Sequence, residues 1–422
     1  MMKKFNICLF ALALISCSAG SQNNTDNEIT ENVPEIADSV IVEEKFYCND
    51  DVAVGAEVTE AYFSTLEGLK IAVVGNQSSM VGNTHLVDTL IGAGVEVVRV
   101  FSPEHGFRGT ADAGEKVNNE IDEKTGIPIV SLYGKNRKPT AAQLEGVDVV
   151  LFDIQDVGVR FYTYISTLHY VMEAVAEEGI KLVVLDRPNP NGHYVDGPVL
   201  KSDFSSFVGM HEVPVVHGMT VGEYAQMING EKWLPEGITC ELEVVTCEGW
   251  DHTKFYELPI APSPNLPNMA SVYLYPSLCF FEGTVVSIGR GTDSPFQLIG
   301  HPDYKIDSTQ VDFEFVPQPN GGSKHPKLEN ETCYGVNLAE IDLGEFRAKG
   351  ELDFTYLFDF YQNLEMGKTF FLPNNFIDLL AGSSDLRKGI INGTSLEEMQ
   401  TGWDEELTAF KEIRSKYLLY SE

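Results

Sequence analysis

Short apolar segments alternate with amphipathic segments through the first half of the chain. Continuous apolar runs predict buried strands, at Leu69–Gly75, Val95–Phe101, Ile127–Leu132, Val147–Ile154, Lys181–Leu185 and Leu242–Val245. Helical spacing of apolar residues separates them, at His85–Ala93, Ala141–Leu144, Tyr164–Glu178 and Thr220–Asn229. Apolar strands that alternate with helices predict a parallel sheet covered on both faces. The expected class is therefore α/β, with a Rossmann-like, doubly wound domain over residues 59–268.

The pattern changes after the proline-rich stretch Pro262–Pro267. Beyond it, strands and helices no longer alternate regularly. Strands are predicted near Val285–Ile288, Phe313–Val316 and Tyr334–Leu338, and helices near Asp353–Tyr361, Phe376–Ala381 and Thr394–Tyr417. Mixed elements of this kind predict a second, smaller α+β domain over residues 269–422.

The first residues have the pattern of a targeting segment. Lys3 and Lys4 precede a short apolar run that ends in Leu-Ile-Ser-Cys17. The run is too short to span a membrane and predicts a signal peptide over residues 1–16. The ending resembles a bacterial lipobox, which implies cleavage before Cys17 and lipidation of that residue. We expect a lipid-anchored protein of the cell envelope, facing the periplasm or on the surface of a Gram-negative bacterium.

A polar segment follows this lipobox-like sequence. Residues 18–44 contain no Lys or Arg and are rich in small polar and acidic residues. Such a segment cannot bury enough apolar surface to fold by itself. Residues 17–58 are therefore predicted to be the lipidated cysteine and a flexible acidic tether.

Charge and motif content exclude several classes of ligand. The formal net charge of −34 argues against nucleic acid, which requires a basic surface. The first strand-to-helix turn, Gly75–Gly82, lacks the Gly-x-Gly-x-x-Gly pattern, and the chain has no P-loop, so no nucleotide cofactor is expected. No Cys/His spacing indicates zinc, and no metal is predicted. Cys240 and Cys247 are close enough in sequence to pair across a hairpin, but their pairing cannot be deduced.

Polar and charged side chains follow several of the predicted strands. They are Glu104, His105 and Arg108; Tyr133, Lys135 and Arg137; Asp153, Gln155, Asp156, Arg160, Tyr162 and Tyr164; and Asp186, Arg187, Asn189 and Asn191. The carboxyl ends of parallel strands meet at one edge, where ligands bind. Planar hydrogen-bonding groups and aromatic faces suit a sugar. An alternative is that residues 186–192 form only a rigid turn with a local ion pair.

The second half adds candidates for the far wall of such a site. Glu282 and Arg290 flank a glycine-rich segment, and Asn265 lies in the preceding proline-rich stretch. Glycines allow a ligand to approach the backbone closely. The alternative is a buried Glu–Arg pair that stabilises a domain junction.

Six ordered motifs resemble the exo-β-N-acetylmuramidase family, the NamZ-like proteins long known only as a domain of unknown function. The motifs are SPEHGFRG (102–109), SLYG (131–134), FDIQDVGVRFYTY (152–164), DRPNPNG (186–192), PSPNLPN (262–268) and FEGTVVSIGRGT (281–292). The resemblance runs from about residue 60 to the C-terminus. It implies a Rossmann-like domain with a smaller C-terminal domain. It also implies release of N-acetylmuramic acid from the non-reducing end of peptidoglycan fragments.

The resemblance implies that Glu104 is the catalytic acid, and glycosidic cleavage needs such a group. The second catalytic group is Asp153 or Asp156, or else the substrate's own acetamido group, which one of these carboxylates would orient. Arg160, Arg187 and Arg290 are candidates to bind the lactyl carboxylate. The predicted substrate-binding set is His105, Arg108, Tyr133, Gln155, Arg160, Tyr162, Asp186, Arg187, Asn189, Asn265, Glu282 and Arg290.

Two other functions explain the same residues. A non-catalytic lipoprotein that binds muropeptides would use the Arg, Asn and Tyr side chains without needing Glu104. A metal-dependent cell-wall hydrolase would hold its metal mainly through Glu104 and His105, and a chelator would abolish its activity. We expect peptidoglycan-derived saccharides of the MurNAc-GlcNAc type as ligands, and no cofactor.

Overall fold

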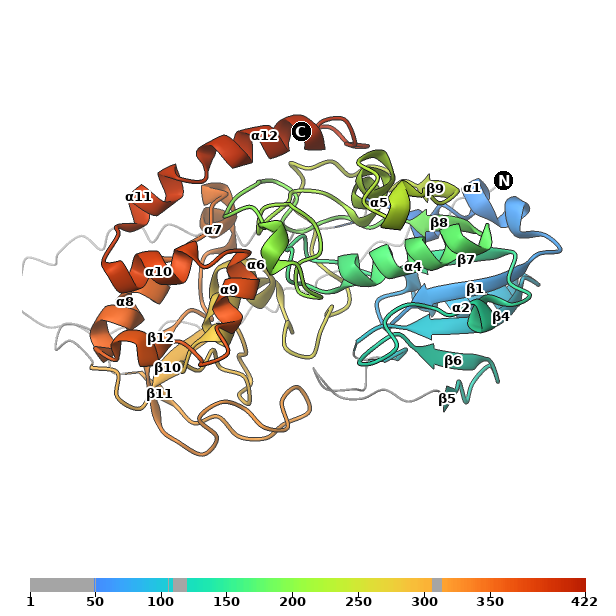
Figure 1. Ribbon diagram of the computed structural model, residues 1–422. Helices are drawn as coiled ribbons and strands as arrows, with labels where there is room; N and C mark the ends of the chain where they lie inside the picture. The colour runs from blue at the N-terminus through green and yellow to red at the C-terminus, as the bar shows by residue number, and fades with distance from the viewer. Residues whose placement is uncertain (1–48, 50, 105, 109–119, 306–312) are drawn as a thin grey trace, which may run out of the picture. The chain divides into compact units, whose positions relative to one another are not determined.

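The computed structural model describes residues 49, 51–104, 106–108, 120–305 and 313–422. Within residues 47–422, which form one compact unit, a seven-stranded sheet is the central element (Figure 1). Its strand order is β5-β6-β4-β1-β7-β8-β9. All neighbouring strands are parallel except β5 and β6. The bounds are β1 Lys70–Gly75, β4 Glu96–Ser102, β5 Glu120–Ile121, β6 Pro128–Ser131, β7 Val149–Asp153, β8 Lys181–Leu185 and β9 Leu242–Val245.

The sheet is doubly wound, as predicted. From β1 the chain moves outward through β4 to β6, and it then returns to the other side of β1 to add β7, β8 and β9. The winding direction therefore reverses at β1. The carboxyl ends of strands at such a reversal leave a crevice in which α/β proteins bind ligands.

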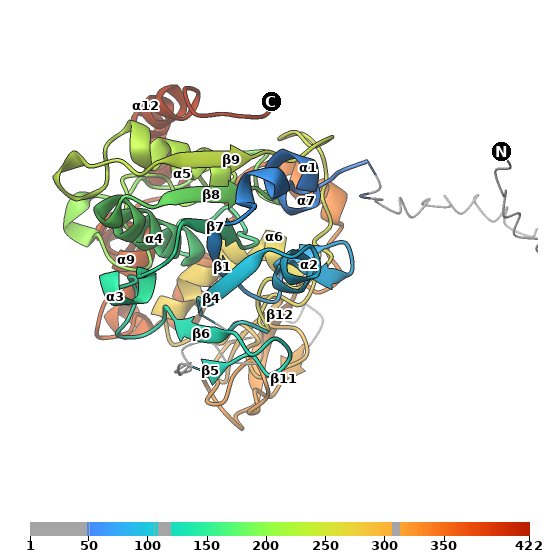
Figure 2. The same cartoon turned by 90° about the vertical axis from the view of Figure 1, so that its right-hand side faces the viewer.

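Alternate residues of each strand point to opposite faces of the sheet, and helices cover both. Ile71 and Val73 of β1 pack in the same core as α2, Leu86–Gly92. Ala72 and Val74 pack in the core that contains α4, Tyr164–Glu178, and α5, Val221–Gly230. Figure 2 shows α2 and α4 on opposite sides of the sheet. This two-sided burial explains why the strands are apolar throughout.

The C-terminal part is smaller and continues the core on the α4 side. It contains a three-stranded antiparallel sheet in the order β10-β12-β11. Its strands are β10 Leu298–His301, β11 Glu314–Phe315 and β12 Cys333–Asn337, and its helices are α6 Met269–Leu278, α7 Leu343–Lys349, α8 Thr355–Leu364, α9 Phe376–Ala381, α10 Asp385–Asn392, α11 Leu396–Thr401 and α12 Asp404–Arg414. The remaining short elements are α1 Thr59–Tyr62, β2 Met80–Val81, β3 Thr84–His85 and α3 Ala141–Leu144.

Two predicted elements of the C-terminal part are wrong. Residues 285–288 form no strand; Thr284 and Ser287 make single bridges to Phe371 and Gly300. The backbone carbonyls of residues 281, 284 and 286 instead accept hydrogen bonds from the Lys327 ammonium. The helix predicted over 394–417 is two helices, α11 and α12, separated by Gly402 and Trp403.

The predicted signal peptide, Cys17 and the predicted tether up to residue 48 lie outside the described residues. The end of the predicted tether is wrong, because Val54, Ala56 and Val58 are buried in the core that contains α2. No helix in the described ranges is long and apolar enough to cross a bilayer. Cys240 and Cys247, which the sequence left as a possible pair, are both free and buried.

A buried histidine just before α5 gives the fold a pH dependence. His217 is 1% exposed, and burial, followed by the charges of Arg414 and Arg160, lowers its pKa to about 3. Its Nδ1 accepts a hydrogen bond from the Met219 amide, at 3.2 Å. Between about pH 6.5 and 3 the unfolded chain binds a proton there that the folded chain does not, so this site destabilises the fold as pH falls.

We expect His217→Asn to remove this acid sensitivity. The Asn carbonyl can replace Nδ1 as acceptor, and loss of the ring costs about 1–3 kcal/mol at pH 7.5. The stability difference from wild type should then shrink by up to about 1.4 kcal/mol per pH unit below pH 6.5. Urea unfolding at several pH values measures this difference. A difference that stayed constant down to pH 4.5 would contradict the assignment.

Candidate active site

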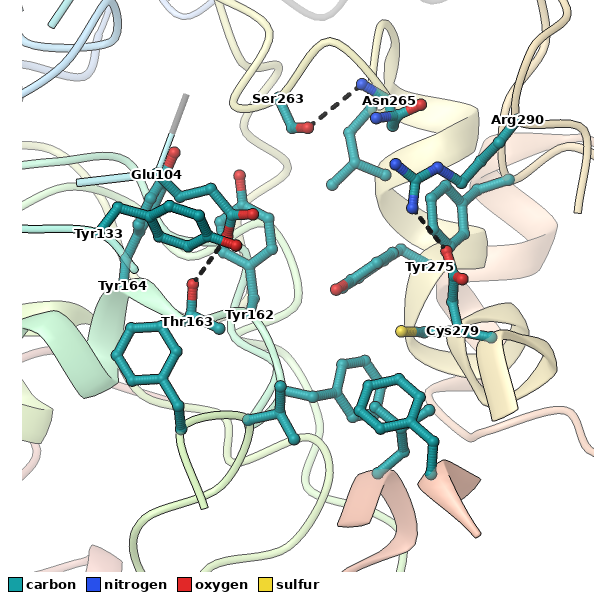
Figure 3. Close-up of a pocket in the computed structure, with 18 of the residues that line it drawn as sticks. Glu104, Tyr133, Tyr162, Thr163, Tyr164, Ser263, Asn265, Tyr275, Cys279 and Arg290 are labelled. Atoms are coloured by element: carbon teal, nitrogen blue, oxygen red, sulfur yellow. Dashed lines mark hydrogen bonds and ion pairs between the residues drawn. The ribbon is translucent and has the colours of Figure 1, made fainter. Parts of the chain in front are cut away.

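A cavity of about 350 Å³ lies where the carboxyl ends of β4, β6 and β7 face the C-terminal part (Figure 3). The wall that follows the sheet strands contributes Glu104, Tyr133, Arg137, Tyr162, Thr163 and Tyr164. The opposite wall contributes Ser263, Asn265, Tyr275, Cys279, Glu282 and Arg290. Apolar side chains complete the lining: Phe161, Phe207, Val208, Leu266, Phe296, Phe376 and Leu380. The first wall thus carries the Glu104 carboxyl group and three tyrosines. The second carries the Glu282–Arg290 ion pair and the Asn265 amide.

Glu104 is half-buried, two residues beyond β4. The Thr163 hydroxyl donates a hydrogen bond to its Oε2, at 3.3 Å. Burial, and then the charge of Glu104 and a hydrogen bond to it, raise the pKa of Tyr133 well above its usual value. Tyr133 therefore stays protonated and can donate to the carboxylate. Two hydroxyls from different loops thus orient the Glu104 carboxyl group in the cavity (Figure 3).

Two further tyrosines are fixed by the segment opposite them. The Tyr162 hydroxyl donates to the Pro262 carbonyl at 2.9 Å, and Tyr164 contacts the same carbonyl at 3.4 Å. The Asn76 amide, just after β1, donates to the Tyr164 oxygen at 3.0 Å. The two rings meet edge to face, 4.9 Å apart. These contacts make the tyrosine wall rigid, which is how a site holds a ligand with little reorganisation.

The opposite wall is built around Glu282 and Arg290. The Arg290 Nη1 lies 3.0 Å from the Glu282 Oε1. The backbone around Glu282 is held by the Lys327 ammonium, which donates to the carbonyls of Phe281, Thr284 and Val286 at 2.9, 2.5 and 3.1 Å. Burial lowers the pKa of Lys327 to about 8. Glu282 and Arg290 therefore form an ion pair, but not the buried one of the alternative prediction, because their side chains are 24% and 25% exposed and line the cavity.

Asn265 presents its amide from the proline-rich stretch. Its Nδ2 donates to the Gly322 carbonyl at 2.7 Å, and its backbone N–H donates to the Ser263 hydroxyl at 3.2 Å. A Cβ at residue 322 would lie 3.1 Å from the Asn265 Oδ1. Glycine at 322 thus gives the amide the room it occupies.

Six predicted site residues line the cavity: Glu104, Tyr133, Tyr162, Asn265, Glu282 and Arg290. The two aspartates predicted as second catalytic groups do not line it. Asp153 is fully buried and forms a two-point ion pair with Arg187, at 2.5 and 3.0 Å. Asp156 accepts from the Gly158 amide at 2.6 Å, and burial raises its pKa to about 7. Their catalytic roles stay predictions.

The predicted binding residues of the DIQDVGVR and DRPNPNG motifs do not line the cavity either. Gln155 donates to the carbonyls of Asp156 and Pro188, both at 2.8 Å. The Asn189 Nδ2 donates to the Met219 carbonyl at 2.9 Å, and a Cβ at Gly158 would lie 2.2 Å from the Asn189 amide. This close approach explains why the two motifs fit together only with glycine at position 158, where φ is +75°.

Two of the three arginines predicted for a ligand carboxylate are engaged internally. Arg160 is fully buried and donates to the carbonyls of Pro198, Val213 and Leu380. Arg187 pairs with Asp153. Burial lowers the pKa of Arg187, but the charge of Asp153 and the hydrogen bonds between the two side chains outweigh burial, so the pKa of Arg187 is raised. Asp186, likewise predicted to bind substrate, accepts hydrogen bonds from Thr220, Gly222 and Tyr420. None of these three side chains lines the cavity.

Arg108 faces a different hollow and makes a two-point ion pair with Asp122, at 2.8 and 2.9 Å. His105 lies outside the described residues. Among the residues that the structure does describe, no group of three His, Cys, Asp or Glu side chains is placed to hold a metal ion.

Several lining residues were not predicted from the sequence. Thr163 lies in the FDIQDVGVRFYTY motif between two tyrosines that were noted, whereas Tyr275 and Phe207 lie outside the six motifs. Arg137 was noted at the end of the third predicted strand but was not chosen, although its position there was the signal that could have found it. Loops bring Arg137, Thr163 and Phe207 to the cavity, whereas Tyr275 reaches it from α6.

A doubly wound sheet with an acid-bearing, tyrosine-walled pocket beyond the carboxyl ends of β4, β6 and β7 defines a Rossmann-like protein whose site suits glycoside cleavage. Similarity to known proteins identifies the family within this class. The chain belongs to the exo-beta-N-acetylmuramidase NamZ family: its N-terminal domain matches residues 71–270 and its C-terminal domain matches residues 273–420. The resemblance found in the six motifs is thereby confirmed.

Known relatives agree with this assignment. The chain is 40% identical over 378 residues to the peptidoglycan beta-N-acetylmuramidase NamZ of Bacillus subtilis, covering 85% of this chain and 89% of that protein. Crystal structures of two DUF1343 family proteins from Bacteroides fragilis each cover 88% of this chain and 99% of their own. They are 47% and 29% identical to it, with TM-scores of 0.81 and 0.75.

Proposed function

We propose that this chain is an exo-acting β-N-acetylmuramidase, a glycosidase that releases N-acetylmuramic acid from the non-reducing end of peptidoglycan fragments. The observation that carries the proposal is Glu104, a carboxyl group held by hydroxyls inside a cavity of about 350 Å³. Such a group can protonate the leaving oxygen of a glycosidic bond. The peptidoglycan beta-N-acetylmuramidase of Bacillus subtilis, 40% identical, supports the choice of substrate.

The cavity suits a single sugar ring at a chain end. Tyrosines on one wall and phenylalanines below offer aromatic faces, and Asn265 offers an amide for hydroxyl groups. Among its described lining residues, the carboxylates are Glu104 and Glu282. Glu282 is occupied by Arg290 at 3.0 Å. Glu104 is therefore the group that we assign to proton transfer, and the substrate's acetamido group is a candidate for attack on the anomeric carbon.

Two isomeric disaccharides test this function. The protein should convert MurNAc-GlcNAc to its two monosaccharides and leave GlcNAc-MurNAc intact, because only the first carries muramic acid at the non-reducing end. Products are identified by mass spectrometry. Tight binding without turnover would favour a muropeptide-binding protein instead. Loss of turnover on adding a chelator would favour a metal-dependent hydrolase.

We propose further that Cys17 carries a lipid and anchors the protein in the cell envelope of a Gram-negative bacterium, facing the periplasm or the outside. The support is the Lys3-Lys4 start, the short apolar run and the Leu-x-x-Cys ending. Cys17→Ala should move the protein from the membrane fraction to the soluble fraction and abolish labelling by a fatty-acid probe. A variant that stayed membrane-bound and labelled would refute the anchor at this residue.

A further inference from the structure

Arg137 is the arginine of the cavity that no carboxylate neutralises among the described residues. It is exposed and lines the same cavity as Glu104. Its guanidinium lies over the Phe207 ring, whose centre is 4.0 Å from the guanidinium carbon. Arg290, by contrast, pairs with Glu282, and Arg160 and Arg187 donate to groups in the interior. Arg137 thus brings to the cavity a guanidinium that is not paired with a carboxylate of the described residues.

The side chain of Arg137 is held in place before any ligand arrives. Phe207, on which it lies, stacks on Tyr170 with ring centres 6.3 Å apart. The Phe207 carbonyl accepts from the Ser166 hydroxyl at 2.8 Å, which ties this loop to α4. An arginine ordered by stacking loses less conformational entropy when it binds a ligand.

The backbone on the other side of Arg137 is also anchored. Lys138 makes ion pairs with Glu173 and Glu177 of α4, at 2.7 and 2.6 Å. Tyr133, at the start of the same loop, is hydrogen-bonded to Glu104, and the charge of Arg137 acts on its phenol. Arg137 therefore lies within electrostatic reach of the group that contacts the proposed catalytic acid.

We infer that Arg137 is a specificity-determining residue, which binds a carboxylate carried by the sugar that occupies the cavity beside Glu104. On the proposed function, on which this inference rests, that group is the lactyl carboxylate of the muramyl residue. The guanidinium matches a carboxylate in two-point geometry. Phe207 and Val208 beside it offer an apolar surface to the lactyl methyl group.

The charge of the whole protein favours a local cation at a site for an anionic ligand. The formal net charge of −34 repels an anionic ligand. Because salt screens exposed charges beyond about 8 Å, a guanidinium in the cavity can still dominate the potential felt there. An anionic sugar without such a partner would bind poorly in this cavity.

The test compares two chromogenic substrates that differ only in this charge. They are 4-nitrophenyl N-acetylmuraminide and its lactyl methylamide, which is neutral. Wild type should prefer the acid, and Arg137→Gln should lose roughly 10- to 150-fold in kcat/KM on the acid, mostly through KM, with little loss on the amide. Arg137→Lys keeps the charge without the planar fork and should retain part of the preference.

Arg290→Gln is the matched control, because it changes the other cavity arginine and should lower activity on both substrates by the same factor. Thermal unfolding of each variant checks that the fold is intact. Equal losses on acid and amide in Arg137→Gln, or an unchanged preference for the acid, would overturn the inference. If wild type turned over neither muraminide, the proposed function would be refuted instead.

Discussion

Replacing Glu104 by Gln should reduce kcat/KM on the MurNAc-GlcNAc disaccharide by about 10²- to 10⁴-fold, the range expected for the loss of a general acid. Gln keeps the size of the side chain and can still accept the hydrogen bond that Thr163 donates at 3.3 Å. It cannot deliver a proton to the departing sugar oxygen. The loss should appear mainly in kcat, while binding of N-acetylmuramic acid, measured by calorimetry, stays close to wild type.

The leaving group tells whether the missing function is proton donation. A sugar alkoxide leaves only when it is protonated, whereas 4-nitrophenolate leaves without a proton because its nitro group stabilises the charge. Glu104→Gln should therefore lose far less activity on 4-nitrophenyl N-acetylmuraminide than on the disaccharide. If Glu104 were a nucleophile or a base, Glu104→Gln would lose activity on both substrates alike. That result would contradict the assignment.

Thr163→Val is a suitable control for this experiment. It removes the hydroxyl that orients Glu104 but leaves the acid in place. We expect kcat/KM to fall by roughly 3- to 10-fold, as for the loss of one neutral hydrogen bond of about 0.5–1.5 kcal/mol. The fall should again be larger on the disaccharide than on the nitrophenyl substrate. A larger loss on the nitrophenyl substrate would mean that the Thr163 hydroxyl does not act through Glu104.

Much of the sheet could be predicted because its strands are buried on both faces. The predicted helix Tyr164–Glu178 and strands Lys181–Leu185 and Leu242–Val245 have the same bounds in the structure. The C-terminal part was harder for a physical reason. All ten residues of α6, Met269–Leu278, are buried, so no amphipathic pattern marks the helix.

The site was harder to predict than the sheet. Strand ends do converge, which correctly placed Glu104 and Tyr133 in one cavity. Convergence also collected Asp153, Asp156 and Arg187, but their side chains do not line the cavity and instead bind groups of the interior. Periodicity tells where a strand ends; it does not tell which of the next few side chains reaches the surface, because that depends on loops such as the one carrying Phe207.

Breaking the buried pair between Asp153 and Arg187 should have the largest effect on stability. Both side chains are at most 4% exposed, and two hydrogen bonds of 2.5 and 3.0 Å join them. Arg187→Met would leave an unpaired buried carboxylate, at a cost of about 3–5 kcal/mol. For a chain of this size we expect a Tm lower by on the order of 10 °C, measured by calorimetry.

The double variant Asp153→Asn with Arg187→Met separates a structural role from a catalytic one. Removing both charges eliminates the unpaired ion, so the double variant should recover much of the stability lost by Arg187→Met, because neutral groups of similar size can replace a buried pair. If Asp153 serves only to hold the loop after β7, the double variant, assayed well below its Tm, should keep kcat within about tenfold of wild type, whereas loss of a catalytic carboxylate costs about 10²- to 10⁴-fold. A stable double variant whose kcat fell by about 10²- to 10⁴-fold would instead show that Asp153 is the second catalytic carboxylate. It would then have to reach the substrate through a rearrangement of the residues that line the cavity.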